Sequence, residues 1–271
     1  MNASALEAIL RRDRAIIIAS LAALTALAWI DLVWLANDMA MDGMDMTGYR
    51  MIPAGQALMM PASSPWKPIE FAYVFVMWVV MMIGMMTPSV APIILVYARI
   101  GGQAAKGRRF APVAWFGGGY FLAWTAFSLV ATSAQWALER AALLTPMMAS
   151  ASNIAGGVLL ILAGLYQWTP LKDICLSQCQ APLGFILSRG GFQGGASNSL
   201  ILGFRHGLYC LGCCWALMAL LFAFGVMNLF WIAALAILVL LEKVVPSGRT
   251  IARIAGVAFF AGGVWMLLQP S

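Results

Sequence analysis

Apolar residues occupy seven long stretches of the chain, and polar residues gather in the short segments between them. The stretches cover residues 15–36, 71–98, 111–138, 149–169, 199–224, 226–242 and 251–268. About 20 consecutive apolar residues are enough for a helix to cross a bilayer. Because backbone amides find no water in lipid, segments of this kind span it as helices. The pattern therefore predicts an all-α bundle of about seven transmembrane helices that forms one domain over residues 1–271.

Basic residues are distributed unevenly between the two sides of such a bundle. Of the 16 Lys and Arg, thirteen lie on the side of the N-terminus, and only Arg50, Lys67 and Arg140 lie on the other side. Positive charge collects in cytoplasmic loops, which predicts an N-in, C-out protein of the bacterial inner membrane. With this topology, residues 37–70 form an outer loop and residues 170–198 form an inner loop.

The first apolar stretch also has features of a signal peptide. It follows Arg11, Arg12 and Arg14 and contains an Ala-Leu-Ala sequence at residues 26–28. The apolar run continues to Leu35, however, which makes it longer than the core of a signal peptide. We therefore expect an uncleaved first helix, with cleavage as the alternative.

Prolines and glycines indicate how the helices pack. Pro88 and Pro92 lie inside the second stretch, where each removes a backbone hydrogen bond. In a membrane the freed carbonyl groups need partners in neighbouring protein or water, so we expect a kink that faces the bundle interior. Small residues let helices approach closely, and the glycines suited to this role are Gly117, Gly118, Gly119, Gly156, Gly157, Gly262 and Gly263.

Composition excludes several classes of protein. Hydrophobic residues make up 63% of the chain and charged residues 10%, whereas soluble domains carry about 25% charged residues. The net charge of +6 is explained by the basic inner loops, so we expect no nucleic-acid partner. The sequence has no phosphate-binding loop motif, which argues against ATP-driven transport by this chain alone.

Methionine is concentrated in the outer loop and in the second apolar stretch. A loop in water gains little from packing methionine, whereas the thioether is a soft, uncharged ligand suited to Cu(I). Met81 and Met85 share one face of the second helix, where they would line a path for a soft cation. Methionine as a filler of gaps between helices is the alternative. The candidate ligands of the outer loop are Met39, Met41, Met44 and Met46.

Cysteine and histidine form a second candidate group near the inner side. His206, Cys210 and Cys214 recur every fourth residue, so they share a helix face. The inner compartment is reducing, which favours metal ligands over disulfides, and His, Cys and Met together make a soft-metal ligand set. Small core residues are the alternative interpretation. The candidate ligands here are His206, Cys210, Cys213 and Cys214 in the fifth stretch, with Cys175 and Cys179 in the inner loop.

Four charged residues fall within or beside apolar stretches, where a charge is a functional candidate. They are Asp31, Glu70, Arg205 and Glu242. The alternatives are an interfacial position, an ion pair, or a side chain that extends to the membrane surface.

Several segments of residues 70–270 resemble an uncharacterised bacterial family of multi-span proteins described as predicted metal-binding integral membrane proteins. The resemblance implies a membrane bundle that binds metal, without implying a reaction. Gln180 departs from the family pattern, which has a basic residue after Cys179. The segments that carry the resemblance are WVVMMIGMMTPS (78–89), YQWTPLK (166–172), CLSQC (175–179), GCCW (212–215) followed by Leu217-Met218, and Glu242-Lys243.

We therefore expect a membrane protein that binds copper as Cu(I) and translocates it or hands it over. The outer methionines would capture the ion and the inner Cys/His group would receive it. Expected partners are the lipid bilayer, the metal ion, and a metallochaperone or metalloenzyme; oligomerisation stays open. One rival is a membrane thiol oxidoreductase that works with quinone through the cysteine pairs. Another is an assembly subunit with a structural metal site.

Overall fold

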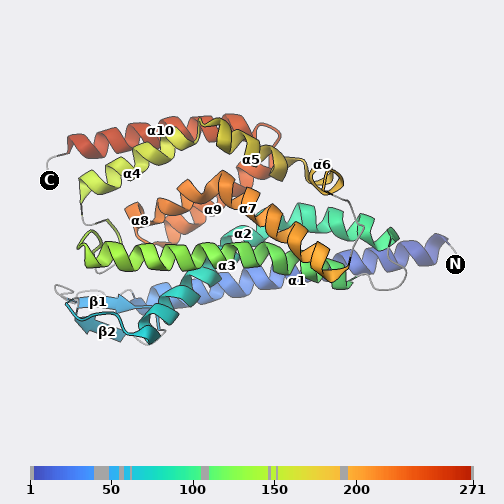
Figure 1. Ribbon diagram of the computed structural model, residues 1–271, viewed down its shortest axis with the longest axis horizontal. Helices are drawn as coiled ribbons and strands as arrows, with labels where there is room; N and C mark the ends of the chain where they lie inside the picture. The colour runs from blue at the N-terminus through green and yellow to red at the C-terminus, as the bar shows by residue number, and fades with distance from the viewer. Residues whose placement is uncertain are drawn as a thin grey trace.

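The computed structural model describes residues 3–39, 49–54, 58–61, 63–104, 110–145, 148–150, 152–189 and 195–269. These residues form a bundle of helices with one small two-stranded sheet (Figure 1). The longer helices run along the long axis of the molecule, and the first helix begins at one end of that axis whereas the last helix finishes at the other. The expectation of an all-α fold is confirmed.

Ten helices are present in the described part of the chain. They are α1 (Ala3–Met39), α2 (Pro68–Ala104), α3 (Phe110–Arg140), α4 (Asn153–Tyr166), α5 (Pro170–Gln180), α6 (Pro182–Leu187), α7 (Ala196–Ala219), α8 (Leu221–Phe224), α9 (Leu229–Val244) and α10 (Gly248–Leu268).

Five of these helical segments are long and apolar enough to cross a membrane. They lie in α1, α2, α3, the α7–α8 segment and α10. A sixth is obtained if α4 and α5, which meet at a bend of 64°, are taken as one broken span. The expected sixth stretch, residues 226–242, corresponds to α9, which has only 16 residues. The structure therefore supports five or six spans among the described residues, and the expected seven are not confirmed.

The helices approach most closely where glycine replaces a side chain. A Cβ atom at Gly119 of α3 would lie 2.0 Å from the carbonyl oxygen of Leu200 in α7. One at Gly203 of α7 would lie 1.9 Å from that of Phe116 in α3. Gly157 of α4 and Gly263 of α10 face each other in the same way. By contrast, Gly117, Gly118 and Gly262 have no neighbouring atom within 4 Å of an added Cβ, so their expected packing role is wrong.

A side chain of α1 supplies a hydrogen bond that Pro88 removes from α2. Pro88 has no N–H to donate to the carbonyl of Gly84, four residues earlier. That carbonyl accepts a hydrogen bond from Nε1 of Trp29 in α1, at 3.3 Å. A protein side chain thus satisfies the freed group, as we expected for a span in lipid.

The segment between α1 and α2, expected to be an outer loop, is partly a folded hairpin. Strands β1 (Tyr49–Ile52) and β2 (Leu58–Pro61) pair antiparallel at the end of the molecule where α10 finishes (Figure 1). Arg50 of β1 forms a 2.6 Å ion pair with Glu70 at the start of α2 and donates to the carbonyl of Ser64 at 2.7 Å. Both charged side chains are buried, so the pair holds the hairpin against the bundle.

The inner segment expected to be a loop over residues 170–198 also contains helices, α5 and α6. Thr169 caps α5, since its side chain accepts a hydrogen bond from the backbone N–H of Lys172, and Pro170 occupies the first turn, where its missing N–H costs nothing. Helix α5 packs on α7 and on α9. Cys175 and Cys179 therefore lie on a helix that is folded back into the bundle.

Candidate metal site

The candidate ligands of α7 lie on the buried face of that helix. His206, Cys210, Cys213 and Cys214 are each 3% exposed or less, and all five cysteines of the chain are free thiols. Since i, i+3 and i+4 positions share a helix face, the spacing of the sequence alone accounts for this arrangement. Side chains of α3, α5 and α9 reach this face.

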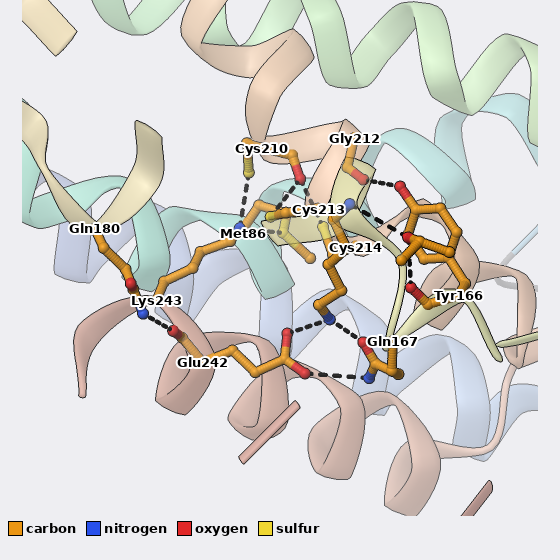
Figure 2. Close-up of polar contacts among 12 residues, drawn as sticks. Met86, Tyr166, Gln167, Gln180, Cys210, Gly212, Cys213, Cys214, Glu242 and Lys243 are labelled. Atoms are coloured by element: carbon orange, nitrogen blue, oxygen red, sulfur yellow. Dashed lines mark hydrogen bonds and ion pairs between the residues drawn. The ribbon is translucent and has the colours of Figure 1, made fainter. Parts of the chain in front are cut away.

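The four thiols of Cys179, Cys210, Cys213 and Cys214 form a cluster of mutual contacts, which we call the thiol cluster. Cys179 of α5 lies close to both Cys210 and Cys213, and Cys214 lies close to the same two residues. The sulfurs of Cys213 and Cys214 also lie 3.0 Å from the carbonyl oxygen of Cys210 (Figure 2). Cys210 and Cys213 are thus the central members.

Cys175 lies beside the thiol cluster without belonging to it. Its sulfur would be 2.7 Å from a Cβ atom at Gly212 of α7. Glycine at position 212 is therefore what lets the Cys175 thiol lie against α7. The cluster itself rests on one cysteine of α5 and three of α7.

A lysine ammonium points into the thiol cluster from α9. Nζ of Lys243 lies 2.8 Å from Sγ of Cys210, 3.3 Å from Oγ of Ser89 and 4.0 Å from Sδ of Met86. The hydroxyl of Tyr120, in α3, is 3.0 Å from the same Cys210 sulfur. Lys243 of α9 and Tyr120 of α3 thus bring polar atoms to this one thiol, and α2 contributes Ser89 and Met86 to the surroundings of the ammonium.

The residue before Lys243 belongs to a separate buried network. Glu242 pairs with Lys172 of α5 at 2.7 Å and accepts a hydrogen bond from Nε2 of Gln167 at 3.1 Å. Lys172 also donates to Oε1 of Gln167, and Gln180 donates to the carbonyl of Glu242 at 2.8 Å. Lys172 and Glu242 are 0% and 1% exposed. The network ties both ends of α5 to α9, and α5 carries Cys179.

His206 lies one helical turn before Cys210 in an aromatic surrounding. Its ring contacts those of Phe116, Tyr120 and Phe185, with centroids 6.2, 5.9 and 5.0 Å away. Nδ1 is buried and has no hydrogen-bond partner among the described residues. His206 therefore borders the thiol cluster with one ring nitrogen unsatisfied.

The methionines of α2 fill the core between the helices. Met81 and Met85, the predicted path residues, are both buried in it. Met86, on the adjoining face, is the methionine whose sulfur approaches the Lys243 ammonium (Figure 2). Met39, at the end of α1, is also buried, whereas Met41, Met44 and Met46 lie outside the described residues.

The predicted charged residues have different surroundings. Glu70 and Glu242 are buried in the ion pairs with Arg50 and Lys172. Asp31 is half-buried and Arg205 is exposed, so Arg205 is not the partner of Glu242.

The candidate ligands suit a soft metal, although they are not arranged around a common metal position. Four thiols and a thioether are ligands suited to Cu(I). Within the described residues, no three His, Cys, Asp or Glu side chains surround a common metal position.

Sequence reasoning missed several residues of this site. Lys172 and Lys243 were counted as basic residues of the inner loops, and Ser89, Tyr120 and Gln167 were given no role. The available signal was the adjacent Glu242-Lys243 pair. Opposite charges side by side at the end of an apolar run indicate two buried partners as readily as a membrane edge.

One comparison with known proteins found a match. The family model described as "PpoB2: Copper chaperone" matches residues 75–266, which includes the thiol cluster, Met86 and Lys243. No curated protein and no solved structure matches the chain.

Proposed function

The chain belongs to the PpoB2 copper chaperone family, and from this premise we propose that it is a membrane protein that binds Cu(I) at the thiol cluster and hands it to a partner protein. Family membership indicates copper handling. The Cu(I) state, the membrane location and the ligands are our proposal.

The observation that carries the proposal is the contact of Cys179 with Cys210 and Cys213. Cys179 and Cys210 are 31 residues apart in the sequence and come from two helices, and the thiols meet among apolar side chains. Cu(I) favours soft sulfur ligands, and metal thiolate bonds form only after the thiol proton has left. The donors Lys243 and Tyr120 at the Cys210 sulfur stabilise negative charge there.

The membrane arrangement is proposed from hydropathy and charge. Five apolar helical segments, an odd number that leaves the two ends of the chain on opposite sides, and the excess of basic residues on one side favour a multi-pass protein of the bacterial inner membrane, N-in and C-out. The thiol cluster would then lie toward the inner side, with the outer segment of residues 37–70 on the opposite side. We propose that Met41, Met44 and Met46 capture copper there and that Met81 and Met85 line its path inward.

The test is metal analysis of the purified full-length protein in detergent, loaded with Cu(I) under a reductant. We expect bound copper in the parent protein and loss of most of it in the Cys210→Ser/Cys213→Ser variant. Cys175→Ser is the matched control, because this thiol is also buried on α5 but lies outside the cluster. A parent protein that binds no Cu(I), or a double variant that binds as much as the parent, would overturn the proposal.

The same thiol contacts give a reason to test a second function. A dithiol oxidoreductase also needs two thiols in contact, since oxidation of two cysteines to a disulfide delivers two electrons and two protons to a quinone. The distinguishing measurement is quinone reduction by the reduced protein in the absence of copper. Stoichiometric formation of hydroquinone with loss of two thiols would favour the enzyme over the copper carrier.

A further inference from the structure

The ammonium group of Lys243 occupies a small site lined by donors from two helices. Cys210 of α7 supplies a sulfur at 2.8 Å, and α2 supplies the hydroxyl of Ser89 at 3.3 Å and the sulfur of Met86 at 4.0 Å. Figure 2 shows the side chain of Lys243 directed to Cys210 and Met86, away from the carboxylate of Glu242. The side chain comes from α9, is only 6% exposed, and fills the space between α2 and α7.

Charge balance assigns a role to the Cys210 sulfur. The nearby pair of Lys172 and Glu242 is neutral by itself. Among the ion pairs of the described residues, none gives Lys243 a carboxylate partner. A buried ammonium without a counter-ion is strongly unfavourable, and the Cys210 sulfur is the atom nearest to it. Within the described residues, the atoms around the Lys243 ammonium are therefore two sulfurs and a hydroxyl, with no carboxylate paired to it.

We propose that the ammonium of Lys243 occupies the copper position in the metal-free protein, and that Cu(I) enters between Cys210 and Met86 by displacing this ammonium. This inference rests on the proposed function and names the entry position for the thiol cluster. A thiolate and a thioether are the donors that a soft monovalent ion prefers. Exchange of one monovalent cation for another leaves the buried charge unchanged, whereas a divalent ion would add an uncompensated positive charge to a medium of low dielectric constant.

After displacement, the side chain of Lys243 can extend beyond the end of α9. Lys243 is the second-last residue of α9, and the following residue, Val244, is 53% exposed. A lysine close to a helix end extends its four-carbon chain to the membrane surface, and the free carbonyl groups of that helix end attract a cation. The side chain can therefore withdraw while α9 stays in place.

Amine labelling followed by mass spectrometry tests the exchange. The full-length protein in detergent is treated with a small amine-reactive reagent, without metal or after loading with Cu(I), Ag(I) or Zn(II), and bound metal is measured in the same samples. Labelling of Lys243 should rise by about an order of magnitude with Cu(I) or Ag(I), because access follows local exposure, and should not rise with Zn(II). Lys67, which is exposed, reports reagent activity, and Lys172, buried in its pair with Glu242, reports intact folding.

The outcomes separate this inference from the proposed function. Bound Cu(I) with Lys243 still protected would overturn the exchange and leave the copper-binding function standing, as would equal exposure of Lys243 by Zn(II). Absence of bound Cu(I) would overturn both. The variant Met86→Leu supplies an independent test, since it keeps the volume of the side chain and removes the sulfur donor. It should weaken Cu(I) binding by about tenfold, whereas Met82→Leu, also buried on α2, should not, and equal affinities would overturn the proposal.

Discussion

Nζ of Lys243 lies 2.8 Å from the sulfur of Cys210, although both residues are surrounded by apolar helices. The contact joins the C-terminal end of α9 to the middle of α7. The neighbouring residue, Glu242, forms an ion pair with Lys172 of α5 at 2.7 Å. Two consecutive residues of one helix thus link it to both helices that carry the thiol cluster.

Removal of one partner of the Lys172–Glu242 pair should destabilise the protein strongly. Lys172→Met leaves the carboxylate of Glu242 buried without its counter-ion, which costs about 3–5 kcal/mol in such cases. The double variant Lys172→Met/Glu242→Met removes both charges and should recover much of that loss. Denaturant titration in detergent, followed by tryptophan fluorescence, measures the three free energies of unfolding. A double variant less stable than Lys172→Met would contradict the expected coupling.

Oxidation should connect α5 to α7 through Cys179. The contacts of Cys179 with Cys210 and Cys213 predict a disulfide between Cys179 and one of these two residues after mild oxidation of the metal-free protein. Peptide mass spectrometry without reduction identifies the linked pair. Prior loading with Cu(I) should protect these thiols, and recovery of Cys175 as the main partner of an α7 cysteine would contradict the geometry.

Close packing of α3 on α7 should depend on Gly203. Gly203→Ala places a Cβ atom against the backbone of Phe116 and should destabilise the bundle by about 1–3 kcal/mol, the usual effect of overpacking. Gly117→Ala is the control, since an added Cβ meets no atom within 4 Å there. It should be neutral or slightly stabilising, because alanine favours helix over glycine. Thermal unfolding of the two variants side by side gives the comparison, and equal stabilities would refute it.

The β1–β2 hairpin should detach when Arg50 is replaced. Arg50→Met removes the ion pair to Glu70 and the hydrogen bond to Ser64, and leaves a carboxylate buried alone. Limited proteolysis should then cut residues 49–61 faster, by about tenfold, because cleavage follows the population of the open segment. Glu70→Gln keeps a side-chain oxygen that accepts from Arg50 and should show a smaller increase. Cleavage of Arg50→Met at the parental rate would show that other contacts hold the hairpin.

The sequence was informative where a feature depends on one helix and less so where it depends on several. The common face of His206, Cys210 and Cys214 follows from helical periodicity, and burial of these residues agrees with it. It was also predictable that a neighbouring group would donate to the carbonyl left free by Pro88, because lipid offers no alternative partner.

The position of Cys179 was not predictable, because it depends on the 64° bend between α4 and α5. A polar segment such as residues 170–198 resembles a loop in composition, and only tertiary packing decides that α5 folds back against α7. The same applies to Lys243, which lies at the end of a 16-residue helix, and to Met86, whose contact with Lys243 depends on the packing of α2 against α9.

The adjacency of Glu242 and Lys243 has a consequence for the speed of exchange. Consecutive side chains on a helix diverge by about 100°, so a rotation of α9 that withdrew Lys243 would also pull Glu242 out of its pair with Lys172. Lys243 must therefore leave by turning about its own side-chain bonds. Such torsional changes are much faster than helix shifts, which take about microseconds to milliseconds. The rate at which copper enters and leaves this position is then limited by delivery and removal of the ion, and no slow rearrangement of the bundle is required.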